Sequence, residues 1–434
     1  MGDRDRLSRI EAEQDRAVGE YFRYQLYPYS AFYRKLLDTA GIGPTGVRTR
    51  ADVSRVPTIT LSDIDDPAAL VLRPDPPRVV AGGSPTFSLA MRWATLTGQE
   101  AKAARRRIDP IYKPIHWTIA SNGTGPGLIV GSSAADLDRL SELGRRWLEQ
   151  AGIRGLDVLV SILPAGPNLA FWQLQLGARR GGVSTLLLEP DAAPDLIAEA
   201  RPTALAGRPA DLVRLLERAT GSVRQAVRTV ITAGDPLDDV ARSRLQELTP
   251  EAFVVAAWSP PGTRALWSEC RGGTGFHTWP HAELVEVVDG EIVWSALGWR
   301  GTALVRLRTG LRGRIDSAQC PTCGRTTPRV LIGPPMPAFA ATLNAAPELA
   351  GWQAELRTVD GKDETTVFVV PAKGFAALEP VLRAVDDEHE VTQFVVVDRA
   401  ALNRRLAAAG NSRVVDLRDG RDSRETDRGV AGVG

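Results

Sequence analysis

All three cysteines of the 434-residue chain belong to one pattern, in which Cys270 and His277 precede the Cys-Pro-Thr-Cys pair Cys320 and Cys323. A Cys-x2-Cys turn directs two thiolates toward one point, and a Cys and a His on another turn or hairpin complete a tetrahedral Cys3His set. Cysteines in long chains can also be plain buried hydrophobic residues. Since no cysteine lies outside the pattern, we favour a structural zinc site without an open position, with His281 as the nearest substitute for His277.

The length and charge of the chain limit its domain count and its partners. With 434 residues, it exceeds the size at which a single core stops growing, so we expect one large domain and a smaller one. The net charge of +1 gives no support for a nucleic-acid partner. No apolar run reaches the length of a membrane span, and no apolar signal segment opens the chain. We therefore expect a cytoplasmic protein without a membrane span.

Residues 116–235 show short β-branched runs that alternate with amphipathic segments. The expected strands are 157–163, 183–188, 203–206 and 227–232, and the expected helices are near 135–151, 168–180 and 209–218. Such alternation predicts an α/β fold with a mainly parallel, helix-covered sheet. Upstream, an aromatic-rich helical period over residues 7–40 predicts two helices broken at Pro28.

Residues 251–332 have the period-two pattern of strands, clearest at 283–288 and 291–295. A Gly-Pro-Pro break at 333–335 then indicates a hinge. The expected domains are a large one at 1–335, a small α+β one at 336–418, and a disordered charged tail at 419–434. In the small domain we expect strands at 365–370 and 392–397 and a helix at 375–386.

Several sequence fragments occur in an order that resembles the phenylacetate–CoA ligase family of adenylate-forming enzymes, over nearly the whole chain. They are YPYSAFYRKLLDTAGI (27–42), VPTITLSDI (56–64), ASNGTGPGLIVGSSAADL (120–137), TAGDPL (232–237), SECRGGTGFH (268–277), VRLRTG (305–310), CPTCGRTTPRV (320–330) and RVVDLR (413–418). The resemblance implies a large domain of helix-covered sheets with a smaller β region, and a small mobile α+β domain. It also implies metal ligands at the Cys3His positions, although the family form is Cys-x-Cys.

The resemblance further implies a phosphate-binding loop at Ser121, Asn122, Gly123 and Thr124 and an adenine-side turn at Asp235. The family loop is rich in hydroxyl groups and carries a Lys that neutralises the phosphates. This loop has fewer hydroxyl groups and no Lys.

Three further groups of the family's active site are replaced in this chain. The Thr-Glu pair whose carboxylate holds Mg2+ aligns with Ser259 and Pro260, or two residues later with Gly262. The Asp that binds the ribose hydroxyls in Arg-Thr-Gly-Asp becomes Leu311, directly after Arg308-Thr309-Gly310. The mobile Lys near the carboxyl terminus becomes Asn411. We therefore expect neither ATP nor Mg2+ as a cofactor.

Three functions remain open at this point. The first is a pseudoenzyme that serves as a scaffold, regulatory subunit or binder of a small acyl or CoA-like ligand, with a protein partner. The second is an enzyme that uses His116, Asn122, Asp235 and Arg308 for ATP-independent acyl or CoA transfer. The third is an AMP-forming acyl-CoA ligase with an unusual nucleotide mode. Because prolines fix φ near the hinge, we also expect a single orientation of the small domain.

Overall fold

The computed structural model describes residues 3–74, 109–120, 127–192, 194–273, 275–288, 291–332, 339, 342–343, 346, 348–360, 362–372, 378–388, 391–408 and 414–417. The chain forms two compact units, which follow one another in sequence at Gly333 and Pro334. Both contain helices packed on strands, so the expected α/β class is confirmed. The predicted tail at 419–434 and the hinge prolines lie outside the described residues.

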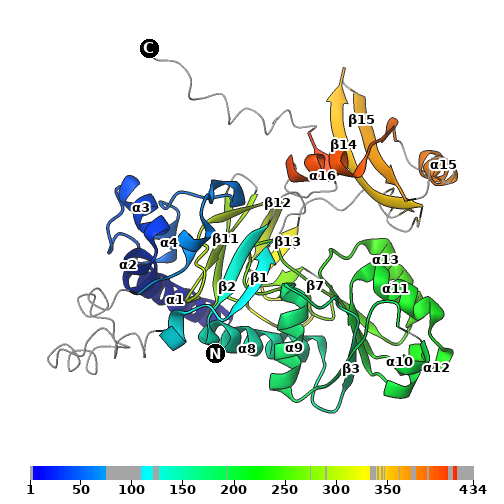
Figure 1. Ribbon diagram of the computed structural model, residues 1–434, viewed down its shortest axis with the longest axis horizontal. Coiled ribbons are helices and arrows are strands. Elements are labelled where there is room, and N and C mark those ends of the chain that lie inside the picture. The colour runs from blue at the N-terminus through cyan, green and yellow to red at the C-terminus, as the bar shows by residue number, and fades with distance from the viewer. Residues whose placement is uncertain are drawn as a thin grey trace. The chain divides into compact units, whose positions relative to one another are not determined.

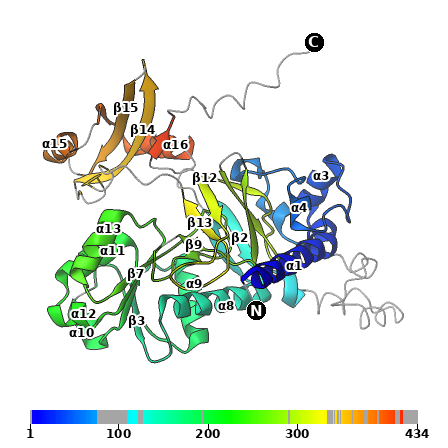
Figure 2. The same ribbon diagram turned by 180° about the vertical axis from the view of Figure 1, so that it is seen from behind.

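Half of the main sheet of the large unit is parallel and has helices on both faces (Figures 1 and 2). Its strands are β3 (Val158–Ser161), β4 (Ser184–Leu187), β5 (Ala204–Gly207), β6 (Thr229–Ala233) and β7 (Phe253–Trp258). One face is covered by α8 (Ala134–Ala151) and α9 (Leu169–Gly181), and the other by α10 (Pro194–Ala200), α11 (Pro209–Arg218), α12 (Gly221–Ala226) and α13 (Asp239–Leu248). Every residue of β5 and β6 is buried, as expected for strands covered on both faces.

Local sequence signals account for the ends of these helices and for their close packing. A capping box of Ser133 and Asp136 begins α8, and Gly152, with φ of 84°, ends it in the left-handed region that favours glycine. Helices α8 and α9 approach closely at Gly144 and Gly177, where a Cβ on Gly144 would lie 2.3 Å from the Gln173 carbonyl oxygen. A larger residue at position 144 would push the two helices apart.

The same sheet continues into an antiparallel half. The additional strands are β8 (Trp267–Ser268), β9 (Phe276–His277), β10 (Glu283–Val288), β11 (Glu291–Ala296), β12 (Leu307–Asp316) and β13 (Arg329–Ile332). The strand order is β10-β11-β12-β13-β9-β8-β7-β6-β5-β3-β4. Strands β1 (His116–Ala120) and β2 (Leu128–Ser132) form a separate antiparallel ribbon. The strands expected within 251–332 are confirmed.

The amino-terminal helices bury their aromatic residues, but the predicted break at Pro28 is wrong. Helix α1 (Asp3–Tyr21) continues through a π-helical turn (Phe22–Leu26) into α2 (Tyr27–Tyr29). Pro28 lies in the first turn of α2, where a missing N–H is tolerated. The chain leaves the helix at Ser30, whose extended backbone (φ −103°, ψ 118°) and side chain cap α3 (Ala31–Thr39). The short helix α4 (Arg50–Val53) follows.

The small unit has a four-stranded sheet with the order β16-β15-β14-β17. Its elements are β14 (Leu349–Val359), β15 (Lys362–Pro371), α15 (Glu379–Glu388), β16 (Gln393–Val396), α16 (Arg399–Ala408) and β17 (Val414–Asp416). Its core includes Trp352 and Val367. The strands expected at 365–370 and 392–397 are confirmed. The expected helix at 375–386 is described from Glu379 onward, and 373–377 lie outside the described residues.

None of the helices in the described residues combines the length and the apolar character that a membrane crossing requires.

A buried carboxylate, that of Glu283, connects β10 to β8 and β11. Its oxygens accept hydrogen bonds from Trp267 Nε1 at 2.9 Å and Trp294 Nε1 at 2.6 Å. The backbone N–H of Trp279 donates a third bond at 2.7 Å. Burial raises the pKa of Glu283 to about 7, although the three donors act in the opposite direction.

This raised pKa predicts a specific loss of stability with rising pH. The native state holds the Glu283 proton up to about pH 7, whereas an unperturbed glutamate releases it near 4.5, so between these values the unfolded state binds fewer protons. Relative to Glu283→Gln, the free energy of unfolding of the wild type should fall by about 3 kcal/mol across this window. Urea unfolding at a series of pH values measures the difference.

The matched control is Glu247→Gln, which removes an exposed carboxylate of α13 and should leave the pH profile of the wild type unchanged. Parallel profiles for the wild type and Glu283→Gln would contradict the assignment.

Candidate functional site

The four Cys3His residues come together where β9 pairs with β13. His277 lies in β9 directly opposite Arg329 of β13, and Cys270 lies in the turn between β8 and β9. Cys320 and Cys323 lie in the turn between β12 and β13. Neighbouring strands of one sheet thus carry two loops that are distant in sequence to the same place.

The potential ligand atoms of Cys270, His277, Cys320 and Cys323 all lie within 4.8 Å of one another. Cys270 Sγ is 3.8 Å from Cys320 Sγ, and Cys323 Sγ is 3.5 Å from His277 Nε2. Around a tetrahedral zinc ion, two sulfurs lie about 3.8 Å apart, and a sulfur and a nitrogen about 3.6 Å apart. Two of the pairs therefore have the spacing of tetrahedral ligands, and the predicted cluster is confirmed as a group that could hold a metal.

The knuckle around Cys320 is shaped by its own backbone. The Cys320 N–H donates to the Arg325 carbonyl at 2.8 Å, and the Gly324 N–H donates to the Cys320 carbonyl at 2.9 Å. Gly324 has a φ of 68°, a conformation that favours glycine. Together these bonds turn the chain so that both thiols of the Cys-x2-Cys pair are on the same side.

The imidazole of His277 is held in the orientation and charge state of a ligand. Its Nδ1 lies 3.1 Å from Thr327 Oγ1, which leaves Nε2 to face the cysteines. Burial, with the charges of Arg325 and Arg329, lowers the pKa of His277 to about 4. The ring is therefore neutral near pH 7, as coordination requires.

The surroundings of the Cys270 thiol disfavour its ionisation, so a thiolate there requires a nearby positive charge. Burial is the main cause that raises the pKa of Cys270 to about 11, and the nearby Cys320 and Cys323 add to it. The Gly272 N–H bonds to the Cys270 thiol and acts in the opposite direction. A bound cation would supply the positive charge that three adjacent thiolates require.

His281, the alternative ligand, lies outside this cluster. Its side chain is exposed, and its Nδ1 is 3.4 Å from Glu13 Oε2 on α1. The structure therefore places His277, and not His281, in the cluster.

The residues that align with the family's Mg2+-binding motif form a closed turn after β7. The hydroxyls of Ser259 and Thr263 lie 2.5 Å apart, and Thr263 Oγ1 donates to the Pro260 carbonyl at 2.8 Å. Gly262 has a φ of 89°, and a Cβ there would lie 2.7 Å from Leu307 Cδ2. The turn buries Ser259 and offers no carboxylate.

Arg308, Thr309 and Gly310, the residues that align with the family's ribose-side motif, lie in β12 at an irregularity of its pairing with β11, and a carboxylate of β11 holds them. Glu291 of β11 pairs with the Arg308 guanidinium and accepts the Gly310 N–H at 2.7 Å. Leu311 follows directly. Asp316, five residues further on, pairs with Arg329 at 2.6 Å and is thus engaged in β13 packing.

The remaining predicted residues are placed only in part. Asp235 is exposed in the loop after β6. His116 lies in β1 with its ring against Trp172, at a centroid distance of 4.5 Å, and burial lowers its pKa. Ser121, Asn122, Gly123 and Thr124 of the predicted phosphate loop, and Asn411 at the position of the mobile lysine, lie outside the described residues.

Sequence reasoning did not identify two residues that position site residues, Thr327 and Glu291. Thr327, which positions His277, lies four residues after Cys323 and resembles any loop threonine. Glu291 could have been suspected, because the antiparallel pairing of the runs 291–295 and 305–310 brings it near Arg308. Contacts of this kind follow from strand register rather than from a sequence motif.

The fold and the sequence of this chain are similar to those of known proteins. No family model matches the chain. Two solved structures of 2-hydroxyisobutyryl-CoA ligase align over nearly its full length. The postadenylation state with 2-HIB-AMP has a TM-score of 0.64 at 18% identity and covers 94% of this chain and 93% of that one. The thioesterification state with 2-HIB-AMP and CoA has a TM-score of 0.59 at 19% identity, covering 96% and 91%.

The fold is therefore that of the acyl-CoA ligases of the adenylate-forming superfamily. Within it, a phenylacetate–coenzyme A ligase from Thermus thermophilus is 24% identical over 355 residues, which cover 76% of this chain and 70% of the relative. This similarity confirms the resemblance to phenylacetate–CoA ligases found in the sequence motifs.

Proposed function

We propose that this protein has the fold of an acyl-CoA ligase without its adenylation chemistry. It serves as a scaffold, a regulatory subunit or a binder of a small acyl or CoA-like ligand, and it works with a protein partner. The observation that carries the proposal is the loss of carboxylates on the nucleotide side of the site. Adenylation expels pyrophosphate from ATP and depends on groups that hold Mg2+ and the ribose.

The closed turn at 259–263 supports this proposal because it leaves no room for the missing acid. Ser259 and Thr263 use their hydroxyls on each other and on the Pro260 carbonyl. A glutamate at Gly262 would have to adopt a positive φ and displace Leu307. A proline side chain has no atom that can bind a cation.

Leu311 supports the same conclusion on the ribose side. An apolar side chain leaves ribose hydroxyls without a partner, which costs on the order of a few kcal/mol. The nearby carboxylate of Glu291 is already bonded to Arg308 and to the Gly310 N–H. The competing function is CoA ligase activity, which the names of the similar proteins state.

The protein should therefore form no acyl-adenylate. Each missing group is typically worth about 100-fold or more in rate. Pyrophosphate exchange with a panel of aromatic and aliphatic acids should stay at background, with an active phenylacetate–CoA ligase assayed in parallel as the positive control. Calorimetric titration of ATP with and without Mg2+ should show no Mg2+-dependent binding. Exchange above background would establish the competing function.

We further propose that the metal of the Cys3His cluster is zinc and that its role is structural. Four protein ligands leave no open position, and the thiolate and imidazole set with tetrahedral spacing is the set that zinc prefers. The ligands come from the loops next to β9 and β13, so a bound metal would cross-link these two strands. The free energy of metal binding would therefore stabilise the folded state.

Substitution of the ligands tests this assignment. His277→Ala should reduce bound zinc to well under one ion per chain and destabilise the large unit by several kcal/mol, since metal binding is coupled to folding. His281→Ala is the matched control, because His281 is exposed and contacts Glu13. It should leave both zinc content and stability unchanged. Elemental analysis and thermal unfolding provide the two measurements. The proposal would be refuted if wild-type protein that is purified under reducing conditions contained no bound zinc.

The orientation of the small unit gives an independent prediction. Because a proline fixes φ, we expect Pro334, Pro335 and Pro337 to stiffen the connection, and Asn411 stands where the resemblance to the ligase family places a mobile lysine. Fluorophores placed through unnatural amino acids at exposed Glu247 and Arg383 report the distance between the units. Single-molecule measurements should show one population that ATP does not change. Two populations that shift with ATP would indicate a working hinge.

A further inference from the structure

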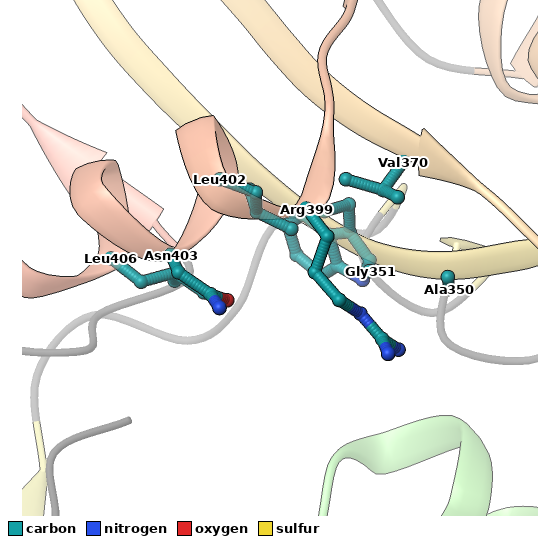
Figure 3. Close-up of a pocket in the computed structure, with 8 residues that line it drawn as sticks. Ala350, Gly351, Val370, Arg399, Leu402, Asn403 and Leu406 are labelled. Atoms are coloured by element: carbon teal, nitrogen blue, oxygen red, sulfur yellow. The ribbon is translucent and has the colours of Figure 1, made fainter. Parts of the chain in front are cut away.

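The small unit contains a pocket of about 400 Å3 between β14, β15 and α16 (Figure 3). This volume falls within the range of about 300 to 1,000 Å3 that is common for small-molecule sites. Its walls are formed chiefly by Trp352, Val370, Arg399, Leu402, Asn403 and Leu406. All of these residues belong to the small unit, so the pocket does not depend on the large one.

The lining of the pocket is partly apolar and partly polar, and its apolar side chains are almost entirely buried. Trp352, Val370 and Leu402 have exposed fractions of only 1%, 7% and 4%. Gly351 lies in the same wall, where a Cβ would come within 2.8 Å of Leu402 Cδ2. The backbone and side chains are thus packed into a fixed surface that can receive a short hydrocarbon or aromatic group.

A single cation lies at the rim of this partly apolar lining. Arg399 is the first residue of α16, and Asn403 follows one helical turn later. Figure 3 shows Leu402 and Val370 beside the backbone end of Arg399, whose guanidinium extends away from them toward open space, with Asn403 on the same helix. The ion pairs among the described residues of the small unit use Glu355 or Glu379, and none of them includes Arg399.

Arg405 and Asp398, two other charged residues near the pocket, are already engaged, and Arg404 is exposed and does not line the pocket. Arg405 pairs with Glu355 and its guanidinium lies over the Phe368 ring at 3.3 Å from the centroid. The carboxylate of Asp398, before the helix, accepts the Ala401 N–H at 2.6 Å. Arg399 is therefore the charged group of this helix that the pocket offers to a ligand.

We propose that this pocket binds the anion of a small carboxylic acid with a short aliphatic or aromatic body. The apolar body would contact Trp352, Val370 and Leu402, and the carboxylate would pair with the Arg399 guanidinium. The planar fork of an arginine matches both oxygens of a carboxylate, and the Asn403 amide can donate to either. A neutral molecule of the same shape would desolvate the guanidinium without replacing its water. This site is separate from the nucleotide side of the large unit and goes beyond the proposed function.

Photoaffinity labelling of the full chain tests the proposal and locates the ligand. The probes are a short aliphatic carboxylic acid that bears a diazirine, and its primary amide as a neutral match. In the wild type, the acid should label peptides that contain residues 350–352 and 399–406 at least tenfold more than the amide does. Both probes can contact the apolar side chains, so the difference measures recognition of the charge.

Arg399→Gln should reduce labelling of these peptides by the acid at least tenfold, because it removes the charge and retains most of the side chain. The matched control is Arg404→Gln, which changes an exposed arginine of the same helix outside the pocket and should leave labelling unchanged. Equal labelling by acid and amide, or labels that map only elsewhere, would overturn the proposal. The acid–amide comparison uses unaltered protein and so decides the question even if Arg399→Gln does not fold.

Discussion

The large unit depends on the pairing of two very short strands, β8 and β9, which join the parallel and antiparallel halves of its sheet. Each has only two residues, and one register pair, Ser268 with His277, connects them. Such short strands contribute few ladder hydrogen bonds. Side chains supply the remaining connections. Glu283 connects β10 to Trp267 of β8, and the Cys3His cluster connects both ends of the β8–β9 turn to the knuckle before β13.

Further side-chain bonds gather at the same short strands. Just before Cys270, the buried Glu269 pairs with Arg242 of α13 and accepts the Ala256 N–H at 2.9 Å. Gln150 of α8 donates to the Ser268 and Glu269 carbonyls, both at 3.0 Å. Helices on opposite faces of the sheet therefore fix the same segment. A metal in the cluster would add a coordination bond to each of four side chains, which is the reason why we propose a structural role for it.

The nucleotide side of the same unit has the opposite character. Among its described residues, Ser259 bonds to Thr263, and Glu291 pairs with Arg308. A ligand that entered here would have to compete with these internal bonds. In the small unit, by contrast, Arg399 borders a partly apolar pocket and makes no ion pair with the described residues. The binding site that we propose therefore belongs to the small unit.

The sequence by itself determined several strands and helices of the large unit and the four residues of the possible metal cluster, and its resemblance to the ligase family placed Leu311 at the position of the ribose carboxylate. These follow from periodicity, from cysteine spacing and from residue identity, which are local properties. The tertiary structure decided what local patterns leave open. A π-helical turn carried the chain past Pro28 to a break at Ser30, and strand register chose His277 over His281. It also brought Glu291 to Arg308 and left Arg399 beside a partly apolar pocket, because contacts between residues distant in sequence are set by packing.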